Sequence, residues 1–267
     1  MSPVDARIAA WDTAAGPFLL LAAGGGAGNA QLIRPEDVEG RFDGGDTAGV
    51  VTLSGRPVDL FNRAGLVGSA VVRPAPASTA SECASFPLAR IEHARRGWLV
   101  ALAAGKAGAI ALDSLDAMSP ADSASFTKAV LDAIATVPAA QDTTFRGIPF
   151  VVAQGYRFTS GGVETLIASV HRGIPSEADP REEIVFVIAE RSAGSATVPR
   201  VGLVRDATGV GDAVPVIDVL AAVRPVATGR PVLIVADEEE SGRTVRFIQR
   251  IGAGRWRPGW TSAYVEC

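Results

Sequence analysis

The chain is poor in the residues from which metal centres and disulfide frameworks are built. Its 267 residues include two cysteines and two histidines. A zinc site needs three or four ligands, most often cysteine or histidine. A catalytic triad needs only one histidine, but the chain has no G-x-S-x-G segment to carry a nucleophile. We therefore predict no metal and no other cofactor, and we favour a protein that is not an enzyme.

The two cysteines, Cys83 and Cys267, lie far apart, and Cys267 is the last residue. A terminal side chain is hard to bury, and an exposed thiol is open to oxidation. One interpretation is a Cys83–Cys267 disulfide, which implies an oxidising compartment, periplasmic or otherwise extracytoplasmic. The alternative is a pair of free thiols, which fits a cytoplasmic protein.

Long apolar runs and basic runs are also missing. No stretch reaches the roughly 18 to 20 apolar residues of a membrane-spanning helix, so we predict no transmembrane segment and leave peripheral membrane association open. The 25 basic and 29 acidic residues give a net charge of -4, and the longest basic run is Arg95-Arg96. A nucleic-acid surface needs clustered positive charge, so we predict a protein partner and no nucleic acid.

What the chain does have is a globular balance, with 48% apolar and 20% charged residues. Short runs of β-branched and aromatic residues recur between glycine and proline turns, which is typical of hairpins. We predict a mainly β or α+β fold made of antiparallel meanders. The expected strands are 18–23, 30–34, 49–53, 58–62, 66–73, 88–93, 98–103, 109–112, 150–153, 165–171, 184–191, 201–205, 232–237, 244–251 and 256–265, while 219–223 fits either a strand or a helix.

One segment, about 119–137, predicts an amphipathic helix. Ser119 is suited to cap it, Pro120 fits its first position, and Asp122 completes a variant of the capping box. Apolar side chains then recur at helical spacing until Pro138 ends the segment. We expect this helix to cover one face of a sheet.

A change in composition divides the chain. Residues 74–87 are rich in proline, alanine and serine and show no periodicity, as expected of a linker. We predict a small N-terminal β lobe over 1–73 and a larger antiparallel α+β lobe over 88–267.

The segment Asp206-Ala-Thr-Gly-Val-Gly-Asp212 resembles the phosphoryl-transfer loop of ribokinase-like carbohydrate kinases. In that family a strand leads into a glycine turn that opens a helix, whose N-terminus favours a phosphate. The resemblance implies a carbohydrate kinase in which Asp212 is the base and Gly209 and Gly211 belong to the anion cradle. The segment 24–29, Gly-Gly-Gly-Ala-Gly-Asn, resembles the same family's glycine-rich sugar-binding segment.

The surroundings of both segments depart from the family pattern. Asn29 is followed by a strand-like run that ends at Pro35, where the family has a helix. Pro215 follows Asp212 closely, where the family has a glycine-containing helix. Beyond Pro231 the sequence alternates with period two, whereas the kinase fold ends in helices. The other interpretation of the first segment is a hairpin loop of turn-forming residues.

Two further patterns have simpler interpretations. Ser125 and Lys128 have the S-x-x-K spacing of serine acyl-transfer enzymes, but the partner motifs are missing, so we expect an exposed lysine on a helix. The acidic stretches 177–183 and 237–240 lack the alternating ligands and the glycine of a calcium loop. We expect both stretches to be solvated turns.

Trp256, Trp260 and Tyr264 share one parity of the last expected strand and should form a single aromatic face. Such a face either belongs to the core or is exposed for docking, because aromatic residues dominate interface hot spots. We keep these three residues as a candidate docking face.

The segments 180–191 and 254–264 resemble uncharacterised envelope proteins of high-GC bacteria, a resemblance with which no activity is associated. We expect a non-catalytic, extracytoplasmic structural or accessory protein that acts through a surface, as a peripheral subunit of a larger envelope assembly. The alternative is a ribokinase-like carbohydrate kinase.

Overall fold

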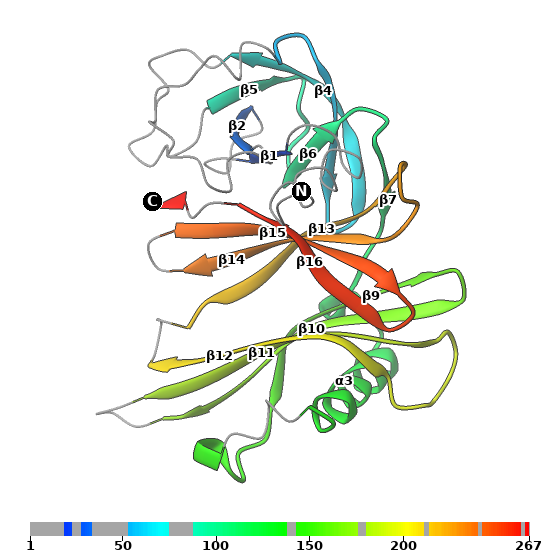
Figure 1. The fold of residues 1–267 in the computed structure, drawn as a ribbon, viewed down its shortest axis with the longest axis vertical. Helices are drawn as coiled ribbons and strands as arrows, with labels where there is room; N and C mark the ends of the chain where they lie inside the picture. The colour runs from blue at the N-terminus through cyan, green and yellow to red at the C-terminus, as the bar shows by residue number, and fades with distance from the viewer. Residues whose placement is uncertain are drawn as a thin grey trace, which may run out of the picture. The chain divides into compact units, whose positions relative to one another are not determined.

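The computed structural model describes residues 19–22, 28–33, 53–74, 88–137, 143–175, 180–210, 214–239, 242–262 and 265–266 (Figure 1). Most of these residues lie in antiparallel strands, and one α-helix, α3 (Pro120–Ile134), occurs among them. The expected mainly β, α+β fold class is therefore confirmed. The undecided segment 219–223 is part of a strand, β13 (Val216–Pro225).

The chain divides into two compact units, and each is described by itself. Unit 1 comprises residues 1–111, 218–249 and 258–267, and unit 2 comprises 112–217 and 250–257. These units differ from the two lobes that the composition predicts. Strands β4 (Gly65–Pro74) and β5 (Leu88–Glu92) flank the expected linker, yet they pair with each other. The change in composition at residues 74–87 therefore does not separate two units, because the strands on either side of it pair with each other.

Unit 1 contains a closed six-stranded barrel with the order β1-β2-β5-β4-β3-β6. The remaining barrel strands are β1 (Leu19–Ala22), β2 (Asn29–Ile33), β3 (Pro57–Asn62) and β6 (Val100–Ala103). Buried aliphatic side chains from all six strands meet in one cluster, with Leu20, Leu32 and Leu60 among the largest. Because strand side chains alternate between the two faces, these residues fill the barrel as a packed core.

The barrel side chains that point outward pack on a second sheet. Its order is β16-β15-β14-β13-β7, and β17 pairs with β15. Leu19 and Phe61 of the barrel share a buried cluster with Ile234, Phe247 and Trp260 of this sheet. Besides β13, the strands of this sheet are β7 (Ala107–Ile110), β14 (Val232–Glu239), β15 (Gly242–Gly252), β16 (Arg255–Thr261) and β17 (Val265–Glu266).

Side chains of β15 alternate as the sequence predicts. Val245 and Phe247 are fully buried, while Arg246 between them bonds the Asp237 carboxylate at 2.6 Å. Asp237 is itself buried, so this end of the acidic stretch 237–240 is not the solvated turn that we expected. A carboxylate inside a protein needs a partner, and the arginine on the neighbouring strand supplies it.

Unit 2 is built on a five-stranded sheet with the order β12-β11-β10-β9-β8. Its strands are β8 (Asp113–Ser114), β9 (Val151–Ser160), β10 (Val163–Ile174), β11 (Arg181–Ser192) and β12 (Arg200–Val210). The predicted helix is confirmed as α3, and it covers one face of this sheet (Figure 1). We call that side the helix face.

Local signals explain α3. The Ser119 hydroxyl accepts a hydrogen bond from the Asp122 backbone N–H, and Pro120 occupies the first position. Phe126 packs so closely on β9 that a Cβ added to Gly155 would lie 2.8 Å from its ring carbon Cζ. Among the described residues, no helix has the length and apolar character required to cross a membrane.

Candidate functional site

The structure places residues 206–210 of the kinase-like segment in extended backbone. Residues 206–210 form the end of β12, and the next element, β13, is a strand where the kinase resemblance implies a helix. Asn29 likewise begins a strand, β2. Gly209 therefore lies in a sheet, and Gly211 and Asp212 fall outside the described residues. Because the next described element is a strand, the described residues on either side of this point place no helix N-terminus toward a phosphate.

Two of the three residues of the candidate docking face are not exposed. Trp256 and Trp260 are both buried, and Tyr264 lies outside the described residues. Trp260 packs edge-on against Phe247, with ring centroids 5.7 Å apart. The two tryptophans are buried in different surroundings, because Trp260 belongs to the core cluster of unit 1, whereas Trp256 lies against Gly202 and donates to Glu190 in unit 2.

Three further candidates are the cysteines, a metal site and Lys128. Cys83 and Cys267 lie outside the described residues. Within the described part of the chain, no three histidine, cysteine or acidic side chains are grouped so that they could hold a metal ion. Lys128 is exposed and bonds Asp132 one helical turn away, at 2.6 Å, as the simpler interpretation of the S-x-x-K spacing predicts.

The helix face of unit 2 changes character along its strands. Next to α3 it is apolar, with Val185, Val187 and Ala189 of β11 in one cluster with the helix. Two residues before Val185, in the same parity, comes Glu183, whose cross-strand neighbour on β10 is Arg172. Both side chains are buried, at 1% and 8% exposure. Glu183 belongs to the stretch 177–183, so the expectation of a solvated turn is wrong at this residue.

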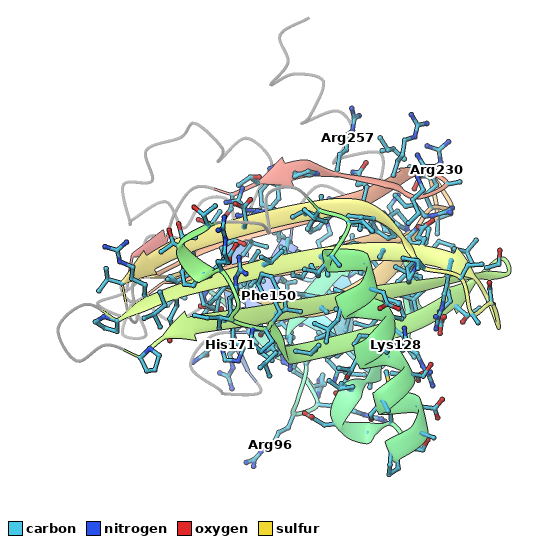
Figure 2. All side chains as sticks on the ribbon, turned by 90° about the horizontal axis from the view of Figure 1, so that it is seen from below. Arg96, Lys128, Phe150, His171, Arg230 and Arg257 are labelled. Carbon is cyan, nitrogen blue, oxygen red and sulfur yellow. The ribbon has the colours of Figure 1, made fainter. Side chains whose placement is uncertain are left out.

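Arg172 and Glu183 form a buried ion pair with one unsatisfied atom. The Arg172 Nε donates to Oε2 of Glu183, and its Nη1 donates to the Phe145 carbonyl at 3.4 Å. The guanidinium also lies over the ring of Phe150, 4.3 Å from its centroid. Figure 2 views the sheet from the helix side and labels Phe150. In contrast, Oε1 of Glu183 is buried without a hydrogen-bond partner among the described residues.

A cavity of about 240 Å³ lies beside this pair, lined by Thr144, Phe145, Arg181, Thr208, Gly209 and Val210. Thr208 is the cross-strand neighbour of Glu183 on β12, and Arg181 precedes Glu183 by two residues on β11. Two of the lining residues, Thr208 and Arg181, are therefore close neighbours of Glu183 in the sheet, and the lining combines a cation, a hydroxyl and apolar groups. Part of the kinase-like segment does line a cavity, but it does so as the edge of a sheet.

The outer strand β12 changes halfway along its length. Its first half contains a register shift at Ile188/Ala189, which leaves Gly202 as an extra residue. A Cβ on Gly202 would lie 2.8 Å from Cδ1 of Trp256, so the turn before β16 covers this part of the strand. In the second half Asp206, Thr208 and Val210 are exposed. Among the described strands, β12 pairs with β11 alone.

On the other face of β11, Glu190 has every hydrogen bond it can use. Arg250 binds both carboxylate oxygens, at 2.6 and 2.9 Å, the Trp256 Nε1 donates to Oε1, and the Gly254 backbone N–H donates to Oε2. Burial alone raises the pKa of Glu190, but these hydrogen bonds together lower that pKa below its usual 4.5. This network fixes the turn that covers Gly202.

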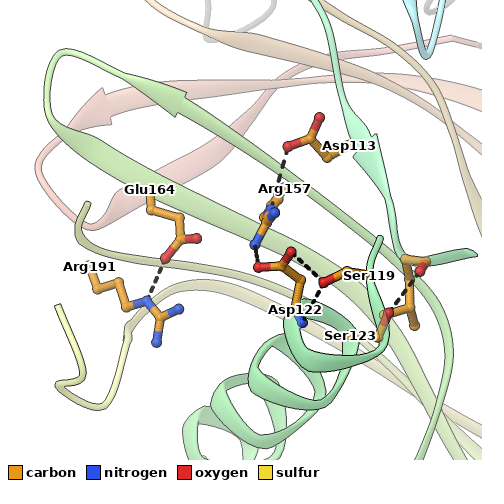
Figure 3. Close-up of polar contacts among 8 residues, drawn as sticks. Asp113, Ser119, Asp122, Ser123, Arg157, Glu164 and Arg191 are labelled. Carbon is orange, nitrogen blue, oxygen red and sulfur yellow. Dashed lines mark hydrogen bonds and ion pairs between the residues drawn. The ribbon is translucent and has the colours of Figure 1, made fainter. Parts of the chain in front are cut away.

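Polar contacts near the start of α3 are more exposed (Figure 3). The Ser119 hydroxyl and the Arg157 guanidinium both donate to Asp122, and they lower the pKa of its carboxyl. Glu164 and Arg191 form a cross-strand pair at 2.5 Å on the helix face. These contacts link the helix to the strands and join neighbouring strands, and none of these residues has a buried polar atom without a partner.

Sequence reasoning missed the Arg172–Glu183 pair, although parity carried a signal. Glu183 stands in phase with the buried residues of β11, and Arg172 stands in phase with the buried Val170 of β10. A charged residue in phase with a buried face predicts an internal ion pair. Comparison of the chain with protein-family models, with curated proteins and with solved structures finds no match.

Proposed function

We propose that the protein is a non-catalytic, extracytoplasmic structural or accessory protein that acts through a surface, as a peripheral subunit of a larger envelope assembly. The surface is the second half of β12, residues 205–210, together with the adjoining cavity. We call residues 205–210 the docking edge.

The exposed docking edge is the observation that carries this proposal. An outer strand presents backbone N–H and C=O groups that can pair with another chain. Proteins restrain such edges with bulges and covering segments, and the first half of β12 has both, at Gly202 and under Trp256. The docking edge lies beyond these devices and exposes Val210 to 53%. A protected half next to an open half supports a role in strand addition, a common mode of protein recognition.

The charged groups inside unit 2 support a framework role. Glu190 and Glu164 each bind an arginine, and the second oxygen of Glu183 is the exception. A general acid or base must be able to exchange its proton with a substrate. Carboxylates held in arginine pairs instead stabilise the strands that carry the docking edge.

Affinity purification from the native source tests the proposal. We expect the wild-type chain to recover a stoichiometric protein partner, and we expect Val210→Lys to lose it, because a lysine there places an uncompensated charge in the contact. Val226→Lys is the matched control, since Val226 is an exposed valine in unit 1. Equal recovery with all three chains, or a wild-type chain that stays free in native extract, would contradict the proposal.

Two further measurements address its other parts. Titration calorimetry with ATP and magnesium should show no binding, whereas micromolar binding that Asp212→Ala abolishes would favour the carbohydrate kinase. Intact-mass measurement with and without reductant should show the two extra hydrogens of a reduced Cys83–Cys267 disulfide. Free thiols in the native protein would instead favour the cytoplasm.

A further inference from the structure

We infer that the docking edge recognises an extended peptide of a partner protein, which pairs antiparallel with β12. From its N-terminus, the peptide has an apolar residue, any residue, a glutamine, any residue and a basic residue. The inference rests on the proposed function and names the chemistry of the partner. It is derived from three exposed side chains on one face and from the unsatisfied carboxylate oxygen beside them.

Asp206, Thr208 and Val210 project to the same face of the sheet, because side chains alternate along a strand. Their cross-strand neighbours on β11 are Val185, Glu183 and Arg181, which identifies that face as the helix face. A strand added to the docking edge would place one residue opposite each of the three. The chemistry of these positions therefore specifies every second residue of the peptide.

The first specified position lies opposite Val210. Val210 is 53% exposed and lines the cavity, so it offers apolar surface that a partner side chain can remove from water. Its neighbour on β11 is Arg181. A basic residue at this position would leave Val210 without an apolar contact, so an apolar residue is favoured.

The second position lies opposite Thr208 and above the cavity. Oε1 of Glu183 is a buried acceptor without a partner among the described residues, and leaving such an atom unsatisfied is unfavourable. Glu183 and the added residue are two strand spacings apart, about 9.5 Å, with Thr208 on the strand between them. A long side chain that ends in N–H can cross this gap over Thr208.

Charge selects glutamine among the long donors. Arg172 already neutralises Glu183. A lysine or arginine inserted there would lose its hydration beside an ion pair that needs no further charge, which is costly. A carboxamide supplies the N–H donor without a charge, and its oxygen can accept a hydrogen bond from the cavity wall.

The third position lies opposite Asp206, where an exposed carboxylate favours lysine or arginine as a cross-strand neighbour. Pairing ends soon afterwards, since the bulge at Gly202 and the overlying Trp256 interrupt the strand. The recognised segment is therefore short, and its three specified residues carry most of the selectivity.

The test uses fluorescence polarisation with the full chain and a labelled synthetic peptide of about nine residues, threonine throughout except for Val-Thr-Gln-Thr-Arg at its centre. The comparison peptide exchanges the end residues to give Arg-Thr-Gln-Thr-Val. Each exchanged position replaces a favourable neighbour by an unfavourable one, so we expect the comparison peptide to bind about tenfold more weakly. Equal binding, or tighter binding of the comparison peptide, would overturn the inference.

Variants of the docking edge complete the test. Asp206→Arg should shift the preference from Val-Thr-Gln-Thr-Arg to Val-Thr-Gln-Thr-Glu, and Thr208→Leu should weaken binding about tenfold by filling the path to Glu183. Val226→Lys should bind as the wild type does. A preference for the basic peptide that survives Asp206→Arg would contradict the assigned register.

The peptide-binding and affinity-purification experiments together distinguish a failure of the recognition pattern from a failure of the proposed function. If Val210→Lys loses the native partner but the peptides are not discriminated, the docking edge stands and the recognition pattern is wrong. If Val210→Lys keeps the partner as well, both proposals fall.

Discussion

Two buried glutamates on the same strand, Glu190 and Glu183, are paired with arginine in different ways. Glu190 accepts hydrogen bonds at both oxygens from a guanidinium, an indole and a backbone N–H. Glu183 binds Arg172 through one oxygen, and its other oxygen is buried without a partner among the described residues. They project to opposite faces of β11, since seven positions separate them and side chains alternate along a strand.

The difference separates a structural contact from a candidate recognition site. A fully satisfied carboxylate holds its surroundings in one arrangement, whereas an unsatisfied one has a hydrogen bond left to make. Glu190 anchors the turn that covers the protected half of β12, and Glu183 lies beside the open half. Four variants and conditions can break or sharpen this contrast.

The largest effect is expected for Glu190→Gln. The amide would direct an NH₂ group at donors that now point to an oxygen, and Arg250 would lose its counter-charge. We expect the free energy of unfolding to fall by about 3 kcal/mol, as measured by denaturant titration. Glu92→Gln is the control, because its pair with Arg73 is exposed on both sides and should contribute about 0.5 kcal/mol or less.

Gly202→Ala should have the next largest effect. The new methyl would lie 2.8 Å from the Trp256 ring and 3.2 Å from the Gly254 backbone carbon, so the turn would have to move. Overpacking of this kind costs about 2 kcal/mol. Gly108→Ala, whose methyl would meet nothing closer than 3.9 Å, serves as the comparison in the same denaturant titration. Equal stability of the two variants would show that the turn does not rest on β12.

Glu183→Gln also removes the counter-charge of an arginine, Arg172, but it should cost less than Glu190→Gln, about 1.5 kcal/mol, because fewer hydrogen bonds to the carboxylate are disturbed. The glutamine oxygen can still accept from Arg172, and its NH₂ group would take the place of an oxygen to which no described donor points. The aromatic rings around Arg172 continue to stabilise its charge. A cost as large as that of Glu190→Gln would mean that Oε1 of Glu183 has a partner after all.

The smallest effect concerns pH. Because the pKa of Glu190 is lower in the folded chain than its usual 4.5, the ionised carboxylate stabilises the fold. This contribution is present above pH 4.5 and is lost as the pH falls through the lower, folded value. The wild type should therefore lose stability more steeply than Glu190→Gln below pH 4.5 in thermal unfolding. Identical slopes would show that the network does not favour the ionised form.

Local signals in the sequence predicted much of the fold. Ser119 and Pro120 locate the start of α3, and the apolar run 184–189 lies in the central strand β11. Local signals of this kind fail where pairing with a neighbouring strand determines the structure. The expected strand 201–205 continues to Val210 because β11 pairs along its full length, although the residues from Asp206 onward favour turns.

The candidate site was harder to predict, because it depends on which strands are neighbours. The contact between Glu190 and Trp256 joins residues far apart in the sequence, and no pattern near either residue announces it. The sequence shows that Trp256 and Trp260 share one parity, but it does not show that both side chains are buried. Thr208 and Gly209 were singled out for a kinase-like motif, and their neighbours in the sheet give them a different setting.

Hydrogen exchange of the backbone amides of β12 tests the central claim most directly. If the docking edge is an open sheet edge, outward-facing amides within residues 205–210 should exchange much faster in the isolated protein than those of residues 185–189 in β11. They should become protected when the peptide or the native partner is added. Amides in 205–210 that are as protected as those of β11 before any partner is added would contradict the account.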